Sequence, residues 1–189
     1  MLEYINELDT QLFLFFNGNH SPFFDMLMVR ITHSRTWIPL YILIIGGIIF
    51  KFKLSGVKLV VTILLLIGFA DQVSSRLAKP GFARLRPSHN ESLSSKIHII
   101  DNYKGGTYGY FSSHASNTFA LTTLLCLLFY KKRKWVLFFI PWAIVVSYSR
   151  IYVGVHYPGD ILTGALFGVG SAFLCYWLFQ RSLLKLIEE

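Results

Sequence analysis

The sequence predicts an all-α protein, a polytopic membrane helix bundle, and three observations lead to that fold class. Hydrophobic residues make up 53% of the 189 positions and charged residues only 15%, whereas soluble domains carry charge on roughly a quarter of their residues. The mean hydropathy is +0.50. The apolar residues lie in runs long enough to cross a bilayer. A soluble globular domain is therefore excluded, and the length suits one membrane domain over 1–189.

Five runs have the length and apolar character of a membrane-spanning helix, which needs about 20 largely apolar residues. They cover residues 36–52, 57–77, 113–130, 135–150 and 158–179. The first is short and contains Gly46 and Gly47, a pair that favours close packing against a neighbouring helix. We expect five strong spans from these runs, with the loop 78–112 as the longest connection.

The N-terminal segment 1–33 is apolar but is broken by polar residues, glycine and proline, namely Asn17, Gly18, Asn19, Pro22, Asp25 and Arg30. This pattern predicts two amphipathic helices, near 4–16 and 21–33, that lie in the membrane interface. The second is a candidate sixth span if it enters the bilayer more deeply. The segment lacks the basic start of a cleavable signal peptide, so we expect the spans themselves to direct insertion.

Basic residues in the short loops predict the orientation, because lysine and arginine concentrate on the cytoplasmic side. They cluster around the ends of the first, third and fifth predicted spans, at Lys51, Lys53, Lys58, Lys131, Lys132, Arg133, Lys134, Arg181 and Lys185. The loop 78–112 then lies on the opposite side. We expect a multi-pass inner (plasma) membrane protein whose active site faces the periplasm or the outside. Such membrane anchors also explain the net charge of +8, so we expect no nucleic-acid partner.

Three polar motifs lie on this outer face. They are Lys79 followed after six residues by Arg86-Pro87, then Phe111-Ser112-Ser113-His114, then Ser149-Arg150 followed after five residues by His156 and after three more by Asp160. The motifs resemble those of the type 2 phosphatidic acid phosphatase superfamily, membrane lipid phosphate phosphatases with a haloperoxidase-like active site. The pattern of that family is K-x6-RP, PSGH and SR-x5-H-x3-D, and both long spacings match. Phe111 replaces its proline and Ser113 its glycine, so we expect phosphate binding to persist and the entry into the third span to differ.

The residue types suit phosphoryl transfer, whose transition state spreads negative charge over the phosphoryl oxygens. The candidate cations are Lys79, Arg86 and Arg150. The planar fork of arginine suits two phosphate oxygens at once, and lysine acts as a point charge. Because backbone N–H groups at a helix start bind anions, we expect the amides of Ser112, Ser113 and His114 to complete the phosphate site.

His156 is the predicted nucleophile. Pro158 suits the first position of a helix, which places Asp160 in the first turn, close to the point where His156 enters. The carboxylate can accept the Nδ1–H of His156 and leave Nε2 free to attack phosphorus. His114 is placed to protonate the leaving oxygen and later to activate water. The resemblance implies the same roles and a phosphohistidine intermediate.

We expect no metal ion and no other cofactor. The outer loops offer only Glu91, Asp101 and Asp160 as carboxylates, too few for a two-metal phosphatase.

Two groups of polar residues fall outside the motifs. Asp71 lies within the second predicted span, and intramembrane carboxylates usually face the bundle and find a partner. We interpret Asp71 as a structural acceptor rather than a substrate ligand, with Ser74, Ser75 and Arg76 as candidate donors. The other histidines have no matching spacing and are interpreted as loop residues: His20, His33, His89 and His98.

The expected function is metal-independent dephosphorylation of a lipid phosphate or diphosphate. The candidate substrates are of the undecaprenyl diphosphate, phosphatidylglycerophosphate or phosphatidic acid type. Lipid A phosphatase and lipid phosphotransferase activities are the alternatives. A non-enzymatic phospholipid carrier would need headgroup sites on two faces, but the motifs occupy one, and the predicted spans disfavour a haloperoxidase. The expected partners are the lipid phosphate substrate and membrane lipids, with no obligate protein partner.

Overall fold

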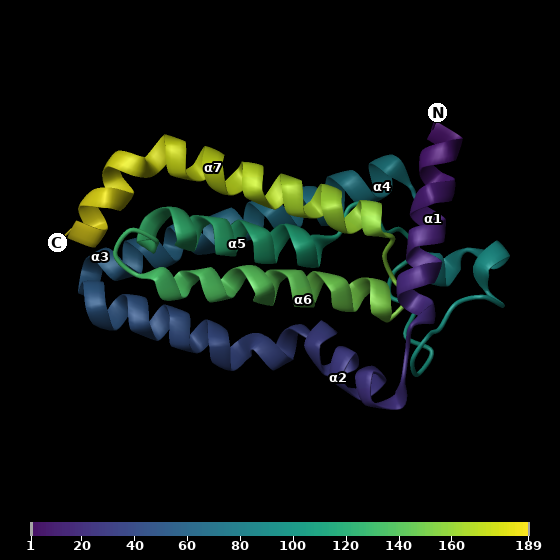
Figure 1. Ribbon diagram of the computed structural model, residues 1–189. Helices are drawn as coiled ribbons and strands as arrows, with labels where there is room; N and C mark the ends of the chain where they lie inside the picture. The colour runs from purple at the N-terminus through teal and green to yellow at the C-terminus, as the bar shows by residue number, and fades with distance from the viewer. Residues whose placement is uncertain (1, 189) are drawn as a thin grey trace.

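The computed structural model describes residues 2–188, with side chains described over residues 3–180. Every regular element in that part of the chain is a helix (Figure 1), which confirms the all-helical prediction. The main helices are α1 (Leu2–Gly18), α2 (Pro22–Thr32), α3 (Ile38–Gln72), α4 (Lys79–Phe82), α5 (Ser113–Phe129), α6 (Phe139–Tyr152) and α7 (Pro158–Glu188). The short 3-10 helices are η1 (Ser34–Trp37), η3 (Pro87–His89), η4 (Glu91–Leu93) and η5 (Lys134–Phe138), and a π-helical segment, η2 (Val73–Ala78), continues α3.

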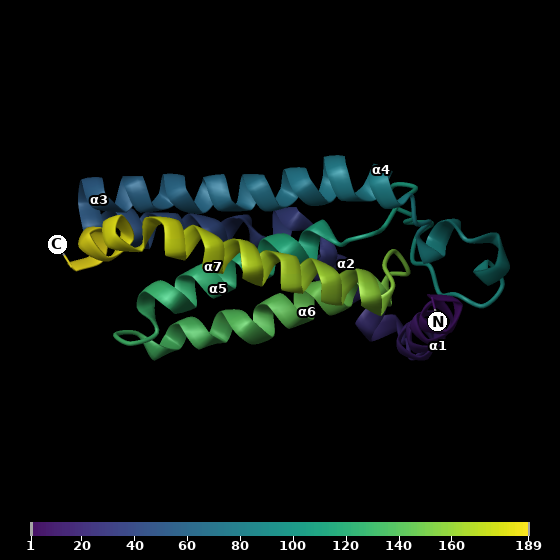
Figure 2. The same ribbon diagram turned by 90° about the horizontal axis from the view of Figure 1, so that it is seen from above.

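α3 is a helical hairpin with two arms. The backbone leaves helical geometry at Lys53, where φ is 50° and ψ is −122°, in the gap that the sequence predicts between the first two spans. The arms approach closely just beyond this turn, because a Cβ atom at Gly56 would lie 2.5 Å from the carbonyl oxygen of Ile48. Figures 1 and 2 show the first arm running away from α2 and the second returning toward α4.

α5 is the central helix of the bundle and packs against α3, α6 and α7. It meets α7 at two glycines, Gly164 and Gly168, where a Cβ atom would collide with the backbone of Ser112 and Ser116. Small residues at such positions let helix backbones approach closely. Leu124 of α5 is fully buried in the apolar core that surrounds this contact.

The outer surface of the bundle is apolar, as a surface in contact with lipid must be. Large apolar side chains are exposed there, including Leu43 at 72%, Phe50 at 88% and Phe138 at 78%. Three helical stretches are long and apolar enough to cross a membrane: Ser34–Phe82, Lys134–Tyr152 and Pro158–Gln180. The first contains both arms of α3. These features describe a membrane protein, and the count of five or six separate spans stays a prediction.

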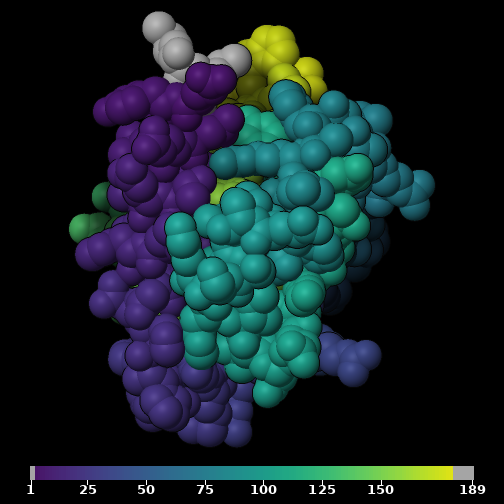
Figure 3. All heavy atoms as spheres, turned by 90° about the vertical axis from the view of Figure 1, so that its right-hand side faces the viewer, coloured from purple at the N-terminus to yellow at the C-terminus, as the bar shows by residue number. Residues whose placement is uncertain are grey.

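α1, α2 and the loop 83–112 cover one end of the bundle (Figure 3). The two helices form close to where the sequence predicts them, and α1 lies crosswise to the long helices (Figures 1 and 2). Buried Asn17 holds this cap together. Its Nδ2 donates to the carbonyl oxygens of Tyr152 (2.8 Å) and His98 (3.0 Å), and its Oδ1 accepts from the His98 N–H (2.8 Å). The placement of α1 and α2 in the membrane interface stays a prediction.

Candidate active site

One cavity at the capped end of the bundle brings the three motifs together. Its volume is about 300 Å³. Six of the residues predicted for the site line it: Lys79, Arg86, Ser113, His114, Arg150 and His156. The other two, Ser112 and Asp160, are fully buried behind this wall, where the N–H of Ser112 donates to the carbonyl oxygen of Asp160 (3.0 Å). Segments that lie far apart in the sequence therefore converge on one pocket.

A tight turn after α6 delivers His156 to the cavity. α6 ends at Tyr152, and Gly154 adopts φ 80°, in the left-handed region that favours glycine. The N–H groups of Val155 and His156 both donate to the carbonyl oxygen of Arg150 (3.1 and 3.2 Å). The turn thus holds the backbone of His156 against that of Arg150.

Asp160 orients the imidazole of His156. It lies in the first turn of α7, which begins at Pro158. Its Oδ2 accepts from the Nδ1–H of His156 (3.2 Å) and from the N–H of Tyr157 (3.1 Å). We assign the imidazole proton to Nδ1 because an ionised carboxylate can only accept. Nε2 then carries a lone pair, and it lies 3.3 Å from Nη1 of Arg86.

The electrostatics of the site keep His156 neutral. Burial disfavours its charged form, and the positive charges of Arg86 and Arg150 disfavour it further, so the pKa of His156 lies well below its usual range. A neutral imidazole with a free lone pair is the reactive form of a histidine nucleophile. Burial and the charge of Arg150 also lower the pKa of Arg86 to about 10, so Arg86 keeps its charge near neutral pH.

Arg150 and Arg86 are positioned by neutral groups rather than by carboxylates. Arg150 donates to the hydroxyl oxygens of Thr32 (2.5 Å) and Tyr103 (3.2 Å), and its buried Nε–H finds no hydrogen-bond partner among the described residues. Arg86 donates through Nε to the carbonyl oxygen of Tyr108 (3.1 Å). Over residues 3–180, neither guanidinium forms an ion pair with an acidic side chain. The cavity therefore favours an anion.

The two departures from the family pattern have defined contacts. The Oγ of Ser113 accepts from Nζ of Lys79 (2.8 Å) and hydrogen-bonds with two serine hydroxyls of η2 (2.8 and 3.0 Å). Glycine offers none of these contacts, so the serine side chain holds Lys79 against the cavity. Phe111 is buried against Phe167 of α7, with ring centroids 4.9 Å apart, and anchors the loop that leads into α5.

Ser112 caps α5 and does not offer its amide to the cavity, contrary to the expectation for that residue. Its Oγ accepts from the N–H of Ala115 (3.4 Å), and its own N–H is bound to the carbonyl oxygen of Asp160. The chain enters the helix along the end of α7, which directs this amide away from the cavity. The amides that the helix start leaves for an anion are therefore those of Ser113 and His114.

Arg84 and Asp9 form a bridge to Asp160 that no sequence motif predicts. The guanidinium donates to Oδ1 of Asp160 (2.8 Å) and Oδ2 of Asp9 (2.7 Å) and lies over the ring of Tyr157, 4.2 Å from its centroid. The other oxygen of Asp9 accepts from the N–H of Gly159 (2.7 Å). Burial alone would lower the pKa of Arg84, but the two carboxylates outweigh burial and raise it. The bridge connects α1 to the carboxylate behind the candidate nucleophile.

Asp71 lies on the cavity wall, and the predicted donors to its carboxylate are wrong. The carboxylate accepts from Nδ2 of Asn117 on α5 (3.1 Å). The Ser74 hydroxyl is hydrogen-bonded to the backbone carbonyl oxygen of Asp71 instead (3.0 Å). The reason is the rotation of η2, which directs the hydroxyls of Ser74 and Ser75 toward α5.

A group of possible metal ligands lies outside the cavity. His20, Asp25 and His98 offer ligand atoms within 4.8 Å of one another. Oδ1 of Asp25 already accepts from the Tyr152 hydroxyl (2.6 Å) and lies 3.0 Å from Nε2 of His98, whose ring stacks on His20 with centroids 3.7 Å apart. These contacts explain the group as a brace between α2, the loop 83–112 and α6.

Comparison with known sequences agrees with the motifs. The model of the PAP2 superfamily matches residues 56–183. The chain is 38% identical over 192 residues to the lipid A 4'-phosphatase of Bacteroides thetaiotaomicron, covering 100% of this chain and 84% of that protein. It is 34% identical over 187 residues to the lipid A 4'-phosphatase of Porphyromonas gingivalis (96% and 78% covered). It is also 32% identical over 187 residues to the undecaprenyl-diphosphatase of Sulfolobus acidocaldarius (96% and 83% covered).

The helical arrangement is shared with a solved structure. The first transmembrane PAP2 type phosphatidylglycerolphosphate phosphatase from Bacillus subtilis superposes with a TM-score of 0.74 at 22% identity, over 94% of this chain and 87% of that chain. At this level of identity the likeness concerns the fold alone.

Proposed function

The chain belongs to the PAP2 superfamily, and we propose that it hydrolyses a phosphate monoester of a lipid A-type substrate through a phosphohistidine intermediate. As a member of this family of phosphatases it is an enzyme, a phosphoric ester hydrolase that acts on lipids. One observation carries the mechanism. Nε2 of His156, which carries the lone pair because Asp160 binds Nδ1, lies 3.3 Å from Arg86 in a cavity that Lys79 and Arg150 also line. None of these three cations forms an ion pair with a carboxylate among the described side chains.

In the first half of the proposed reaction the phosphate group occupies the cavity, where Lys79, Arg86 and Arg150 counter its charge. Nε2 of His156 attacks phosphorus, and a P–N bond forms as the P–O bond to the lipid breaks. His114 gives a proton to the departing oxygen. The cations and the helix-start amides stabilise the charge that spreads over the phosphoryl oxygens.

In the second half His114 takes a proton from water, whose oxygen attacks phosphorus. The P–N bond breaks, inorganic phosphate leaves and His156 returns to its neutral form. Asp160 holds the Nδ1–H throughout and offsets the positive charge that the ring gains as a phosphohistidine. Attack by the hydroxyl of a second lipid, in place of water, would give phosphotransfer from the same intermediate.

The proposed preference for a monoester over a diphosphate rests on Asp71. Its carboxylate lines the cavity and would repel a second phosphate group, whereas it can accept hydrogen bonds from the hydroxyl or amide groups of a sugar headgroup. The two lipid A 4'-phosphatases that match nearly the whole chain support the same choice. Undecaprenyl diphosphate is the second candidate, favoured by the relative from Sulfolobus acidocaldarius.

We place the cavity on the periplasmic or outer side of the plasma membrane. The basic loop 131–134 and the turn of α3 at Lys53 lie at the end of α5 that is remote from Ser113, and such loops are cytoplasmic in most membrane proteins. Cysteines introduced at Ser94 and Lys132 should therefore react with an impermeant reagent from opposite sides of intact cells. Reaction of Lys132→Cys alone from outside would reverse the orientation.

The substrate is tested by phosphate release from lipid A, undecaprenyl diphosphate, phosphatidylglycerophosphate and phosphatidic acid in one detergent. We expect the highest kcat/KM for lipid A. Asp71→Asn should reduce the ratio of kcat/KM for lipid A to kcat/KM for undecaprenyl diphosphate. A wild-type preference for the diphosphate would replace the proposed substrate.

The nucleophile is tested separately by rapid quench with labelled substrate. Acid-labile, base-stable phosphate should be trapped on the wild-type protein and be absent from His156→Ala, while Lys79, Arg86 and Arg150 still bind inorganic phosphate in that variant. Label that persists in His156→Ala would remove His156 from this role.

A further inference from the structure

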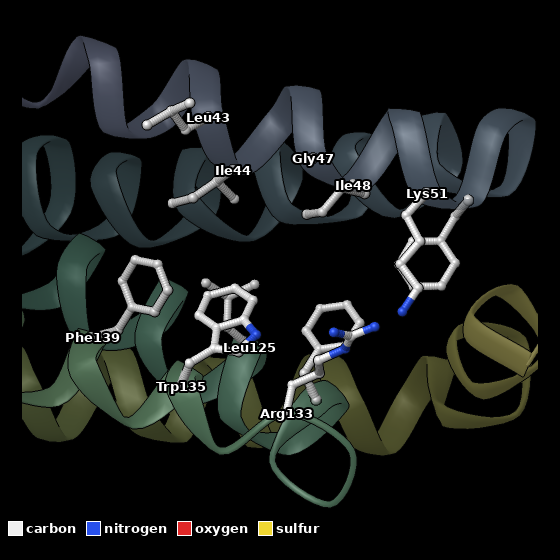
Figure 4. Close-up of a pocket in the computed structure, with 11 residues that line it drawn as sticks. Leu43, Ile44, Gly47, Ile48, Lys51, Leu125, Arg133, Trp135 and Phe139 are labelled. Atoms are coloured by element: carbon white, nitrogen blue, oxygen red, sulfur yellow. The ribbon is translucent and has the colours of Figure 1, made fainter.

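A second cavity lies at the end of the bundle opposite to the candidate active site. It has a volume of about 230 Å³ and lies between the first arm of α3 and the connection from α5 to α6. Figure 4 shows Ile44 and Ile48 of α3 on one wall and Trp135 and Phe139 on the other. On α5 the lining of the active-site cavity ends at Thr118 and that of the second cavity begins at Leu125, so about 10 Å of helix lies between them. The two cavities share no lining residue.

The cavity is apolar along its length but has two cations at one end. Lys51 comes from α3 and Arg133 from the opposite wall, and both line the cavity (Figure 4). Nζ of Lys51 lies 5.1 Å from the centroid of the Phe52 ring. Among the side chains described, neither cation forms an ion pair with a carboxylate. Two like charges that share one mouth are stabilised when an anion lies between them.

We propose that this cavity binds an anionic phospholipid, with an acyl-chain segment between the apolar walls and the phosphate between Lys51 and Arg133. Basic pockets between membrane helices on the cytoplasmic side recognise the headgroups of anionic lipids. Trp135 is half exposed beside the same mouth, and tryptophan is enriched at the depth of the headgroups. The volume is below the roughly 300–1,000 Å³ of small-molecule sites, so it accommodates part of one chain rather than a whole lipid.

The wall at Gly47 supports the proposal and provides its test. A Cβ atom at Gly47 would meet no other heavy atom within 4 Å, so the helix accepts a side chain there, and that side chain would enter the cavity. Gly46 is equally open but does not line the cavity. Gly47→Phe therefore fills the cavity, and Gly46→Phe controls for the effect of a larger residue on α3.

The experiment measures retention of phosphatidylglycerol by the purified full chain with native mass spectrometry, beside phosphatidylethanolamine and inorganic phosphate as probes. Lys51→Ala with Arg133→Ala should weaken phosphatidylglycerol binding about 30-fold, the factor that corresponds to roughly 1 kcal/mol for each cation near an anionic headgroup. Gly47→Phe should weaken it by a similar factor. Phosphatidylglycerol binding should match that of the wild type in two controls, Gly46→Phe and the double variant Lys58→Ala with Lys132→Ala.

Each other outcome overturns the proposal. Equal retention of phosphatidylethanolamine would remove the role of the cations, and unchanged phosphatidylglycerol binding in Gly47→Phe would remove the cavity. If inorganic phosphate bound as strongly as phosphatidylglycerol, the site would recognise an anion and not a lipid. Phosphate release from a lipid phosphate serves as the folding control, because none of the substituted residues lines the active-site cavity.

Discussion

Arg84→Ala is expected to lower kcat about 100-fold, although Arg84 does not touch the cavity. Its guanidinium pairs at 2.8 Å with Asp160, whose side chain is 0% exposed. Removal of one partner from a buried ion pair costs roughly 3–5 kcal/mol, and solvent screening reduces that figure because the Arg84 side chain is 23% exposed. That cost is one of folding free energy. The part that we expect in the activation free energy, about 2–3 kcal/mol, corresponds to roughly 30- to 150-fold in rate.

The physical reason is that Asp160 without Arg84 is a buried carboxylate with an uncompensated charge. Burial then favours the protonated carboxyl, which accepts the Nδ1–H of His156 less strongly, and the orientation of Nε2 toward phosphorus would be lost. The assay is single-turnover formation of the phosphohistidine, which isolates the chemical step, together with KM. We expect the trapping rate to fall and KM to change little, since Arg84 contacts no part of the cavity wall.

Asp9→Asn is the matched control. It weakens the other end of the same bridge, the link to α1, and keeps the Arg84–Asp160 pair. The melting temperature should fall because one of the two hydrogen bonds of Asp9 is lost, while kcat should stay within about threefold of the wild type because the Arg84–Asp160 pair is kept. The reasoning is refuted if Arg84→Ala keeps near-normal trapping, or if Asp9→Asn lowers kcat as much as Arg84→Ala does.

Four further predictions concern the site and the bundle. Neutral His156 is the reactive form, so as the pH is lowered kcat/KM should fall only near the pKa of His156, which lies well below 6.5. Arg86→Gln removes a positive charge, so in this variant the fall should occur at higher pH. An unchanged pH profile would contradict the electrostatic account. Activity should survive excess EDTA, and loss on chelation that a divalent ion restores would exclude the metal-free mechanism. Gly168→Ala should lower the free energy of unfolding by about 1–3 kcal/mol, because the added methyl group would collide with α5. Gly170→Ala is the control, since a Cβ atom there meets no other heavy atom within 4 Å. Equal melting temperatures of the two variants would disprove the close α5–α7 contact. His114→Ala should lose least activity toward an aryl phosphate with an acidic phenol, whose departure needs no proton; uniform loss over all leaving groups would remove its role as general acid.

The membrane class, the helical architecture and most of the candidate site could be predicted from the sequence. The length of an apolar run is a local property, so the helices could be placed before any tertiary contact was known. The contact between His156 and Asp160 is local as well, since the two residues are four positions apart at a helix start. Phosphate chemistry requires cations, and the motif spacing predicts Lys79, Arg86 and Arg150 as the candidates without reference to their neighbours.

Tertiary structure alone decided which groups support that site. Arg84 meets Asp9 and Asp160 across 75 and 76 positions, and Asp71 meets Asn117 across 46. Contacts of this kind depend on which helices pack together and on how each is rotated about its axis. That rotation is set by the fit of many apolar side chains and close-packed glycines, and it leaves no periodic signal at the polar residues it brings together.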